Sequence, residues 1–141
     1  MGSPATVMPG VVRVTAGNAS PFTFTGTNSF VVGHDRVAVL DPGPDNARHR
    51  EALLRTIACR RVDAIILTHT HKDHSAGALA LQSATSAPLL FAGSHRLSRP
   101  RRLFEINPIA KDCDWALRPD RTLLDGERLH VGDLELLAVA T

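Results

Sequence analysis

The segment that most constrains this chain is residues 68–74 (THTHKDH), which follows directly on the apolar run at residues 64–67 (AIIL). It contains three imidazoles and one carboxylate, which are side chains of the kind that Zn²⁺ binds. His69, His71 and Asp73 share a parity, so their side chains would leave one face of an extended backbone. His74 joins them only if the chain turns there, as it would on entering a helix. The sequence therefore predicts a strand end that delivers four metal ligands into a small volume.

Each of these histidines, taken alone, has an ordinary interpretation as a solvated residue at a strand end. Packing does not explain three of them beside an aspartate, because neutral imidazoles and a carboxylate are costly to bury without partners. The pattern also differs from the helical H-E-x-x-H site of zinc proteases, which needs a Glu where this chain has Thr70. Metal binding is the favoured interpretation.

The order H-x-H-x-D-H at residues 69–74 resembles the signature of the metallo-β-lactamase superfamily. Residues 26–33 (GTNSFVVG) look like the strand that opens that fold, and residues 37–43 (VAVLDPG) look like the next strand with the family's Asp-x-Gly turn. The resemblance extends from about Val11 onward. Within the superfamily it is most similar to bacterial hydrolases akin to β-lactamase-like protein 2, an endoribonuclease-type branch. Glyoxalase-II-like thioesterases share most of the same features.

The resemblance implies that two zinc ions divide the four side chains. His69 and His71 would bind the first ion, and Asp73 with His74 the second. A hydroxide bridging the ions, its pKa lowered toward neutrality, would attack a phosphodiester, a thioester or a related ester. Asp73 would be catalytic, because it would orient that hydroxide and accept its proton. Asp41 is a candidate to hold a ligand or its backbone in place, the alternative being an ordinary turn residue.

The family completes its two metal sites with later ligands, namely a His in a Pro-Gly-His-Thr turn, a bridging Asp and a last His. None of them occurs before Thr141, and the remaining histidines match no ligand position and are expected to be exposed: His34, His49, His95 and His130. We therefore expect residues 11–141 to be the N-terminal portion of a metallo-β-lactamase-like domain, truncated before those ligands, after a flexible tail over residues 1–10.

The implied fold class is α+β, the N-terminal half of an αββα sandwich with a mixed β-sheet and flanking helices. One half of such a sandwich would expose the sheet face that the other half covers, and a homodimer could bury that face. Besides the hydrolase, a second function therefore stays open for the chain as it stands: a non-catalytic fragment or interaction module with an incomplete metal site.

Hydrophobic patterning predicts the elements around the histidine segment. A helix capped by Asp45 or Asn46 and a strand buried on both faces precede the segment, and a second helix follows it. Strand, helix and strand in that order favour a right-handed crossover with parallel pairing. Cys59 is expected to be buried in the first helix, and Trp115 to anchor an irregular region. The predicted spans are residues 29–32 and 36–40 (a hairpin), 62–67, 76–84, 88–91, 121–124, 128–131 and 134–140.

Composition limits the partners and the location. A net charge of +2 over 141 residues is too small to indicate nucleic-acid binding. An arginine cluster within residues 96–102 leaves an RNA-contacting patch open beside the ordinary interpretation of a solvated segment. No apolar stretch approaches the ~20 residues of a membrane span, and residues 1–10 lack the apolar core of a signal peptide. We expect a cytoplasmic protein that acts on a small-molecule ester or thioester, or on an RNA phosphodiester.

Overall fold

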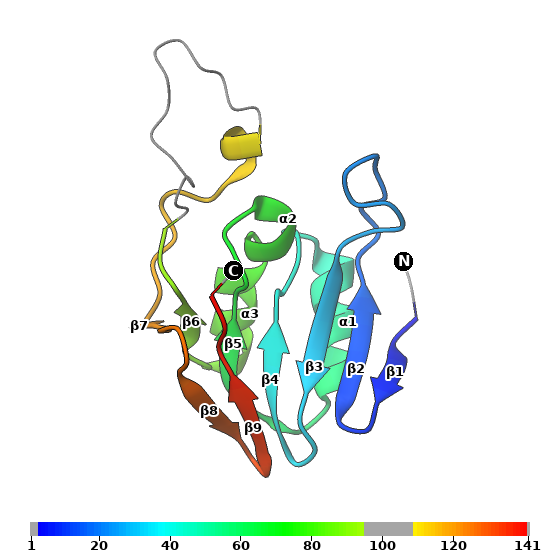
Figure 1. The fold of residues 1–141 in the computed structure, drawn as a ribbon. Helices are drawn as coiled ribbons and strands as arrows, with labels where there is room; N and C mark the ends of the chain where they lie inside the picture. The colour runs from blue at the N-terminus through cyan, green and yellow to red at the C-terminus, as the bar shows by residue number, and fades with distance from the viewer. Residues whose placement is uncertain (1–2, 95–108, 141) are drawn as a thin grey trace.

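A mixed seven-stranded sheet forms the centre of the computed structural model, which describes residues 3–94 and 109–140 (Figure 1). The strands lie side by side in chain order, antiparallel from the first to the fourth and parallel from the fourth to the seventh. They are β1 (Ala5–Met8), β2 (Val11–Thr15), β3 (Asn28–Val32), β4 (Arg36–Leu40), β5 (Arg61–Ile66), β6 (Leu89–Phe91) and β7 (Arg121–Thr122).

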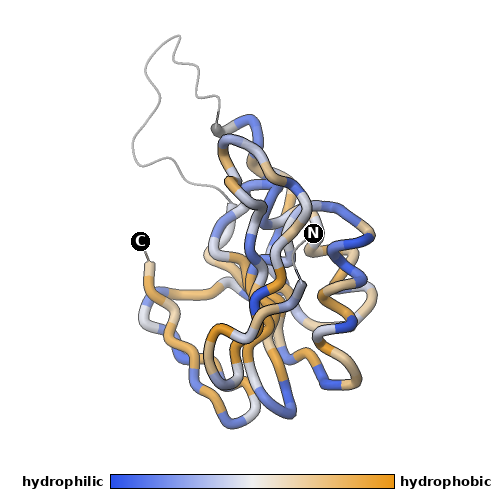
Figure 2. Tube along the Cα trace, turned by 90° about the vertical axis from the view of Figure 1, so that its right-hand side faces the viewer, coloured by the Kyte–Doolittle hydropathy of each residue, from blue (hydrophilic) through white to orange (hydrophobic). Residues whose placement is uncertain are grey.

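The sheet buries apolar side chains on both of its faces. Two helices, α1 (Ala47–Ile57) and α3 (Ala78–Thr85), cover one face, and a separate hairpin of β8 (Arg128–Val131) and β9 (Leu134–Leu137) lies on the other (Figure 1). Seen edge-on, the apolar strands lie between these two coverings (Figure 2). The short helix α2 (Lys72–Ser75) follows β5, and a 3₁₀ helix, η1 (Ile109–Asp112), precedes β7.

One irregularity interrupts the pairing of β4 with β5. Val37 pairs with Val62, but the next residue of β4 pairs with Ala64, so Asp63 is an additional residue on β5. The bulge explains why Val62 and Ile65, three positions apart, both face the helices. The carboxylate of Asp63 accepts hydrogen bonds from Nε and Nη2 of Arg36, and these bonds lower the pKa of Asp63.

Several predicted elements are confirmed, together with the α+β class and the mixed sheet with flanking helices. The hairpin of β3 and β4 forms, and β5 and β6 pair in parallel across the predicted crossover. Asn46 caps α1, because its Oδ1 accepts the backbone N–H of His49 at 3.1 Å. These elements come from strong local signals, a cap residue and uninterrupted β-branched runs.

The predicted flexible tail over residues 1–10 is wrong for Ala5–Met8, which form β1 and pair with β2. Thr6 and Val7 are good strand residues, and Gly10, at φ 76°, allows the tight turn that brings β1 against its neighbour. A short edge strand of this kind gives little signal beyond that turn. The truncation of the domain after residue 141 stays a prediction.

Two predictions of burial are also wrong. His49 is fully buried, because the first turn of α1 directs it under the loop after β4. Cys59 is exposed, since α1 ends at Ile57 and the chain turns at Ala58, which has φ 55°. Trp115 is 44% exposed, and its role as an anchor of the irregular region stays a prediction. His95 and the arginine cluster at residues 96–102 lie outside the described residues.

Some apolar side chains stay exposed near the end of the chain: Leu124, Leu137 and Val139. Leu137 belongs to β9, so the hairpin leaves apolar surface of its own uncovered, and the homodimer stays a prediction. Among the described residues, none of the helices has the length and apolar character that crossing a membrane requires.

Candidate metal centre

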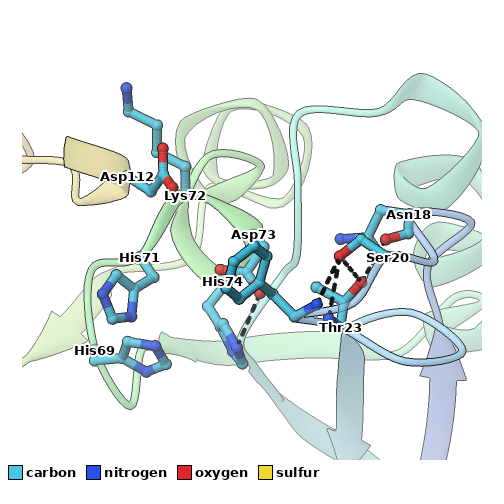
Figure 3. Close-up of a pocket in the computed structure, with 10 residues that line it drawn as sticks. Asn18, Ser20, Thr23, His69, His71, Lys72, Asp73, His74 and Asp112 are labelled. Carbon is cyan, nitrogen blue, oxygen red and sulfur yellow. Dashed lines mark hydrogen bonds and ion pairs between the residues drawn. The ribbon is translucent and has the colours of Figure 1, made fainter. Parts of the chain in front are cut away.

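The predicted site residues gather where two parallel strands end. Asp41 follows β4, and the histidine segment follows β5 and continues into α2. Because β4 and β5 run in parallel, their carboxyl ends meet at the same edge of the sheet. A pocket of about 720 Å³ opens there (Figure 3), lined by Asn18, Ser20, Phe22, Thr23, His69, His71, Lys72, Asp73, His74 and Asp112.

Asp41 is a buried carboxylate at the centre of a hydrogen-bond network next to this pocket. Its Oδ1 accepts the backbone N–H of Thr68 at 2.8 Å, and its Oδ2 accepts the Thr68 hydroxyl at 2.7 Å. The same Oδ2 lies 3.0 Å from Nδ1 of His74. The residue is 6% exposed and has φ 49°, a left-handed conformation that non-glycine residues seldom adopt. Three donors therefore hold one carboxylate in place.

This network determines which ring nitrogen of His69 and of His74 is available to bind a metal. The Thr68 hydroxyl gives its single proton to Asp41, so its oxygen accepts a hydrogen bond from Nδ1 of His69, 2.9 Å away. The Nδ1 atom of His74 likewise donates to Asp41. In both neutral rings the lone pair then lies on Nε2. Metal-binding histidines show this pattern, in which the other ring nitrogen donates to a carboxylate or another acceptor.

Burial and the neighbouring charges together move the pKa values of His69 and His74 in opposite directions. Burial lowers the pKa of His69, and the neighbouring rings of His74 and His71 lower it further. Burial also acts to lower the pKa of His74. The hydrogen bond and the charge of Asp41, with the charge of Asp73, outweigh that effect and raise it. His69 is therefore the ring more strongly held in its neutral, ligand-competent form.

Asp73 is held by a hydrogen bond from Thr27, in the loop between β2 and β3. Its Oδ2 accepts the hydroxyl of Thr27 at 3.0 Å. The side chain of Asn18 contacts Thr27 twice: Nδ2 donates to the hydroxyl at 3.0 Å, and Oδ1 accepts the backbone N–H at 2.9 Å. Thr27 is 5% exposed, so this chain of bonds ties the loop between β2 and β3 directly to α2.

The donor set fits zinc in its chemistry and in the spacing of one pair. Nε2 of His74 lies 3.4 Å from Oδ2 of Asp73, and tetrahedral ligands at about 2.1 Å from an ion stand roughly 3.4 Å apart. The ring centroid of His69 is 4.6 Å from that of His71 and 4.3 Å from that of His74. Within residues 3–94 and 109–140, no three His, Cys, Asp or Glu side chains already form a ready-made metal group. Binding would require the rings to converge further.

The structure thus brings together His69, His71, Asp73, His74 and Asp41, while their metal-binding and catalytic roles stay predictions. His34 and His130 are exposed, as expected, and do not line the pocket. The residues that sequence reasoning missed are hydroxyl- and amide-bearing supports: Asn18, Thr27 and Thr68. The only sequence signal for them is position, since Thr68 directly precedes the ligand segment and Thr27 directly precedes β3.

Comparison with known proteins places this geometry in context. Residues 22–140 match the family model described as the metallo-beta-lactamase superfamily. The chain is 31% identical over 134 residues to the lactamase-like protein aptB of Emericella nidulans, covering 93% of this chain and 37% of that protein. It is 36% identical over 74 residues to an atrochrysone carboxyl ACP thioesterase of Paecilomyces divaricatus, covering 50% of this chain and 24% of that protein.

Among solved structures, the fold is similar to that of a metallo-β-lactamase, MIM-1, from Novosphingobium pentaromativorans. The TM-score is 0.66 at 23% identity, and the match covers 94% of this chain and 48% of that chain. The sequence therefore spans about half of this solved structure and little more than a third, or less, of these two curated relatives.

Proposed function

Because this chain belongs to the metallo-β-lactamase superfamily, we propose that its protein is a zinc-dependent hydrolase of esters, and of thioesters in particular. The observation that carries the proposal is the arrangement of His69 and His74, whose Nδ1 atoms are both engaged. Their Nε2 atoms are then left for a metal beside Asp73. The resemblance in the H-x-H-x-D-H order supports two ions, with His69 and His71 on one and Asp73 and His74 on the other.

Zinc supplies Lewis acidity, which polarises a carbonyl oxygen and lowers the pKa of water toward neutrality. The chain's own residues would supply position and proton transfer. Asp73 lines the pocket and would orient the attacking water and accept its proton. Thr27, which donates to Oδ2 of Asp73, fixes the direction in which that carboxylate faces. Asp41 keeps the rings of His69 and His74 in the tautomer that binds metal through Nε2.

The substrate class is supported by the pocket wall and by the relatives. Phe22 gives the pocket an apolar side next to the polar donors, a combination suited to an acyl group attached to a reactive carbonyl. The matched relative from Paecilomyces divaricatus is named as a thioesterase of an acyl carrier protein. Nothing in the described residues favours a phosphodiester to the same degree, and the arginine cluster that would contact RNA lies outside them.

The test uses the product of the complete reading frame that contains this sequence. Its zinc content is measured by mass spectrometry, and turnover is measured on an acyl thioester, on bis(p-nitrophenyl) phosphate and on RNA. We expect bound zinc, thioester hydrolysis that a chelator abolishes, and loss of turnover in Asp73→Asn. His130→Ala, which changes an exposed ring away from the pocket, is the matched control. A metal-free protein, or one that turns over only phosphodiesters, would contradict the proposal.

The same measurements on the 141-residue chain alone address the alternative of a non-catalytic fragment or interaction module. That alternative is favoured by the absence of a ready-made group of three metal donors among the described residues. Weak zinc binding without turnover would support it for this chain, while tight zinc with turnover would exclude it. Neither outcome changes the proposal for the complete protein, which is tested separately by the measurements above.

A further inference from the structure

His49 is a fully buried histidine that the metal chemistry does not use. Its exposure is 0%, and its Nε2 lies 2.8 Å from the hydroxyl of Ser29, which is also fully buried. Its Nδ1 has no hydrogen-bond partner among the described residues. An unpaired buried polar atom is costly, and such atoms are rare enough in folded proteins to need an explanation.

The ring of His49 lies directly against the loop that follows β4. A Cβ atom added to Gly43 would stand 2.7 Å from Nε2 and 2.8 Å from Cδ2 of the ring, so the ring already fills that space. Gly43 also has φ 85°, which a side chain would strain. The absence of a side chain at residue 43 therefore allows α1 to support this loop through an imidazole.

The opposite side of the same loop holds the candidate metal ligand His74. The N–H of Gly43 donates to the carbonyl of His74 at 2.9 Å, and the N–H of Gly77 donates to the carbonyl of Gly43 at 2.9 Å. Asp41, two residues before Gly43, holds the His74 ring through Nδ1. The loop therefore contacts His74 at both backbone and side chain. The ring of His49 packs against the same loop at Gly43.

Two simpler roles for His49 account less well for these contacts. The pair with Ser29 resembles a nucleophile and its base, but both side chains have no exposed surface, so no substrate reaches them. Pure space filling would be served by an apolar residue at lower cost, because one ring nitrogen stays unpaired. What the imidazole adds is a flat ring against Gly43 with an anchor to β3 through Ser29.

We propose that His49 is a positioning residue for the metal centre: anchored by Ser29, its ring fixes the loop at Gly43 and thereby the place of His74. The role in metal binding rests on the proposed function, whereas the support of the loop does not. Two measurements therefore separate them, one on the metal-free protein and one with zinc.

The first measurement is amide hydrogen exchange at Gly43 and Gly77 in the metal-free product of the complete reading frame. His49→Phe keeps a ring but leaves the buried Ser29 hydroxyl unpaired, and we expect exchange at both amides to accelerate at least tenfold. Ser29→Ala should accelerate the same amides. His49→Gln can place a terminal polar atom near the position of Nε2 and should restore most of the protection. Ile57→Val, a buried change at the other end of α1, should leave both amides unchanged.

The second measurement is zinc affinity by competition with a chelator. Removing an outer support of a metal ligand weakens binding by about tenfold to a hundredfold, so His49→Phe should fall in that range and His49→Gln should stay near the wild type. Unchanged amide exchange in His49→Phe would overturn the proposal, as would equal acceleration in His49→Gln. If the wild type binds no zinc, the proposed function fails, while the exchange rates still decide whether His49 supports the loop.

Discussion

Oδ2 of Asp41 lies 3.0 Å from Nδ1 of His74, although 33 positions separate the two residues in the chain. The contact joins the loop after β4 to the helix after β5, and it directs Nε2 of His74 toward Asp73. A carboxylate that is 6% exposed thus organises a ring that lines the pocket. This contact is the basis of the first prediction.

Asp41→Asn should weaken zinc binding by about tenfold to a hundredfold, because its amide group cannot accept all the hydrogen bonds that the carboxylate accepts. The measurement is competition with a chelating dye at neutral pH. Asp45→Asn is the matched control, since the Asp45 side chain is 72% exposed and its ion pair with Arg50 is 3.6 Å long. Equal affinities in Asp41→Asn and the wild type would show that Asp41 is only a turn residue.

Thr27→Val should lower kcat for thioester hydrolysis by about tenfold while leaving KM near the wild-type value. The change removes the hydroxyl that orients Oδ2 of Asp73, and groups that act only in the transition state affect kcat. Thr56→Val is the control, because the Thr56 hydroxyl bonds only within α1, to Ala52. A selective rise in KM would instead assign Thr27 to substrate binding.

Phe22→Ala should raise KM for a long-chain acyl thioester several-fold and should have a smaller effect on an acetyl thioester. Phe22 lines the pocket and is 89% exposed. Its replacement should therefore change the free energy of unfolding by less than about 0.5 kcal/mol. Phe24→Ala is the matched control, since that side chain is 85% exposed and does not line the pocket. Identical KM values for the two variants would exclude an acyl-binding role for Phe22.

Gly43→Ala should destabilise the protein more than Gly126→Ala does. Both glycines have positive φ values, 85° and 75°, so both variants strain the backbone. Only at residue 43 would the new Cβ meet the His49 ring, since nothing lies within 4 Å at residue 126. The expected difference is about 1–3 kcal/mol in the free energy of unfolding, measured by urea denaturation. The double variant Gly43→Ala/His49→Ala should recover part of that loss, which would identify the ring as the cause.

The pH dependence of stability should contain a contribution from His49. Burial lowers the pKa of His49 below its usual value of 6.5. The unfolded chain then binds a proton that the folded protein does not, so stability is complete above that value and is lost as the pH falls below it. In the metal-free protein, His49→Gln should remove up to about 1.4 kcal/mol of this loss per pH unit. Urea denaturation at pH 7.5 and 5.5 measures it, and equal slopes in both proteins would contradict it.

The sequence predicted the parts of the fold that have strong local signals. The β-branched run before the histidines forms β5, Asn46 caps α1, and the spacing of four donors placed them in one pocket. The supports could not be predicted in this way. Thr27 reaches Asp73 across 46 positions, and the partners of such a hydroxyl depend on which loops the fold brings together.

The burial of His49 could not be predicted from the sequence either. Its position in the first turn of α1 is typical of an exposed polar residue, and its actual environment depends on Gly43 and on Ser29 of β3. A histidine is compatible with both environments because it is both aromatic and polar. Only the packing of the helix on the sheet distinguishes them.

The bulge at Asp63 has a consequence for engineering. The extra residue shifts β5 by one position relative to β4 before the strands reach the pocket. Deleting Asp63 would restore an uninterrupted ladder and leave the later pairs, Ala38 with Ala64 and Val39 with Ile65, on the faces that they occupy now. Strand swaps between relatives can therefore differ by one residue at the start of β5, because the pairs after the bulge set the direction in which the ligand segment leaves the sheet.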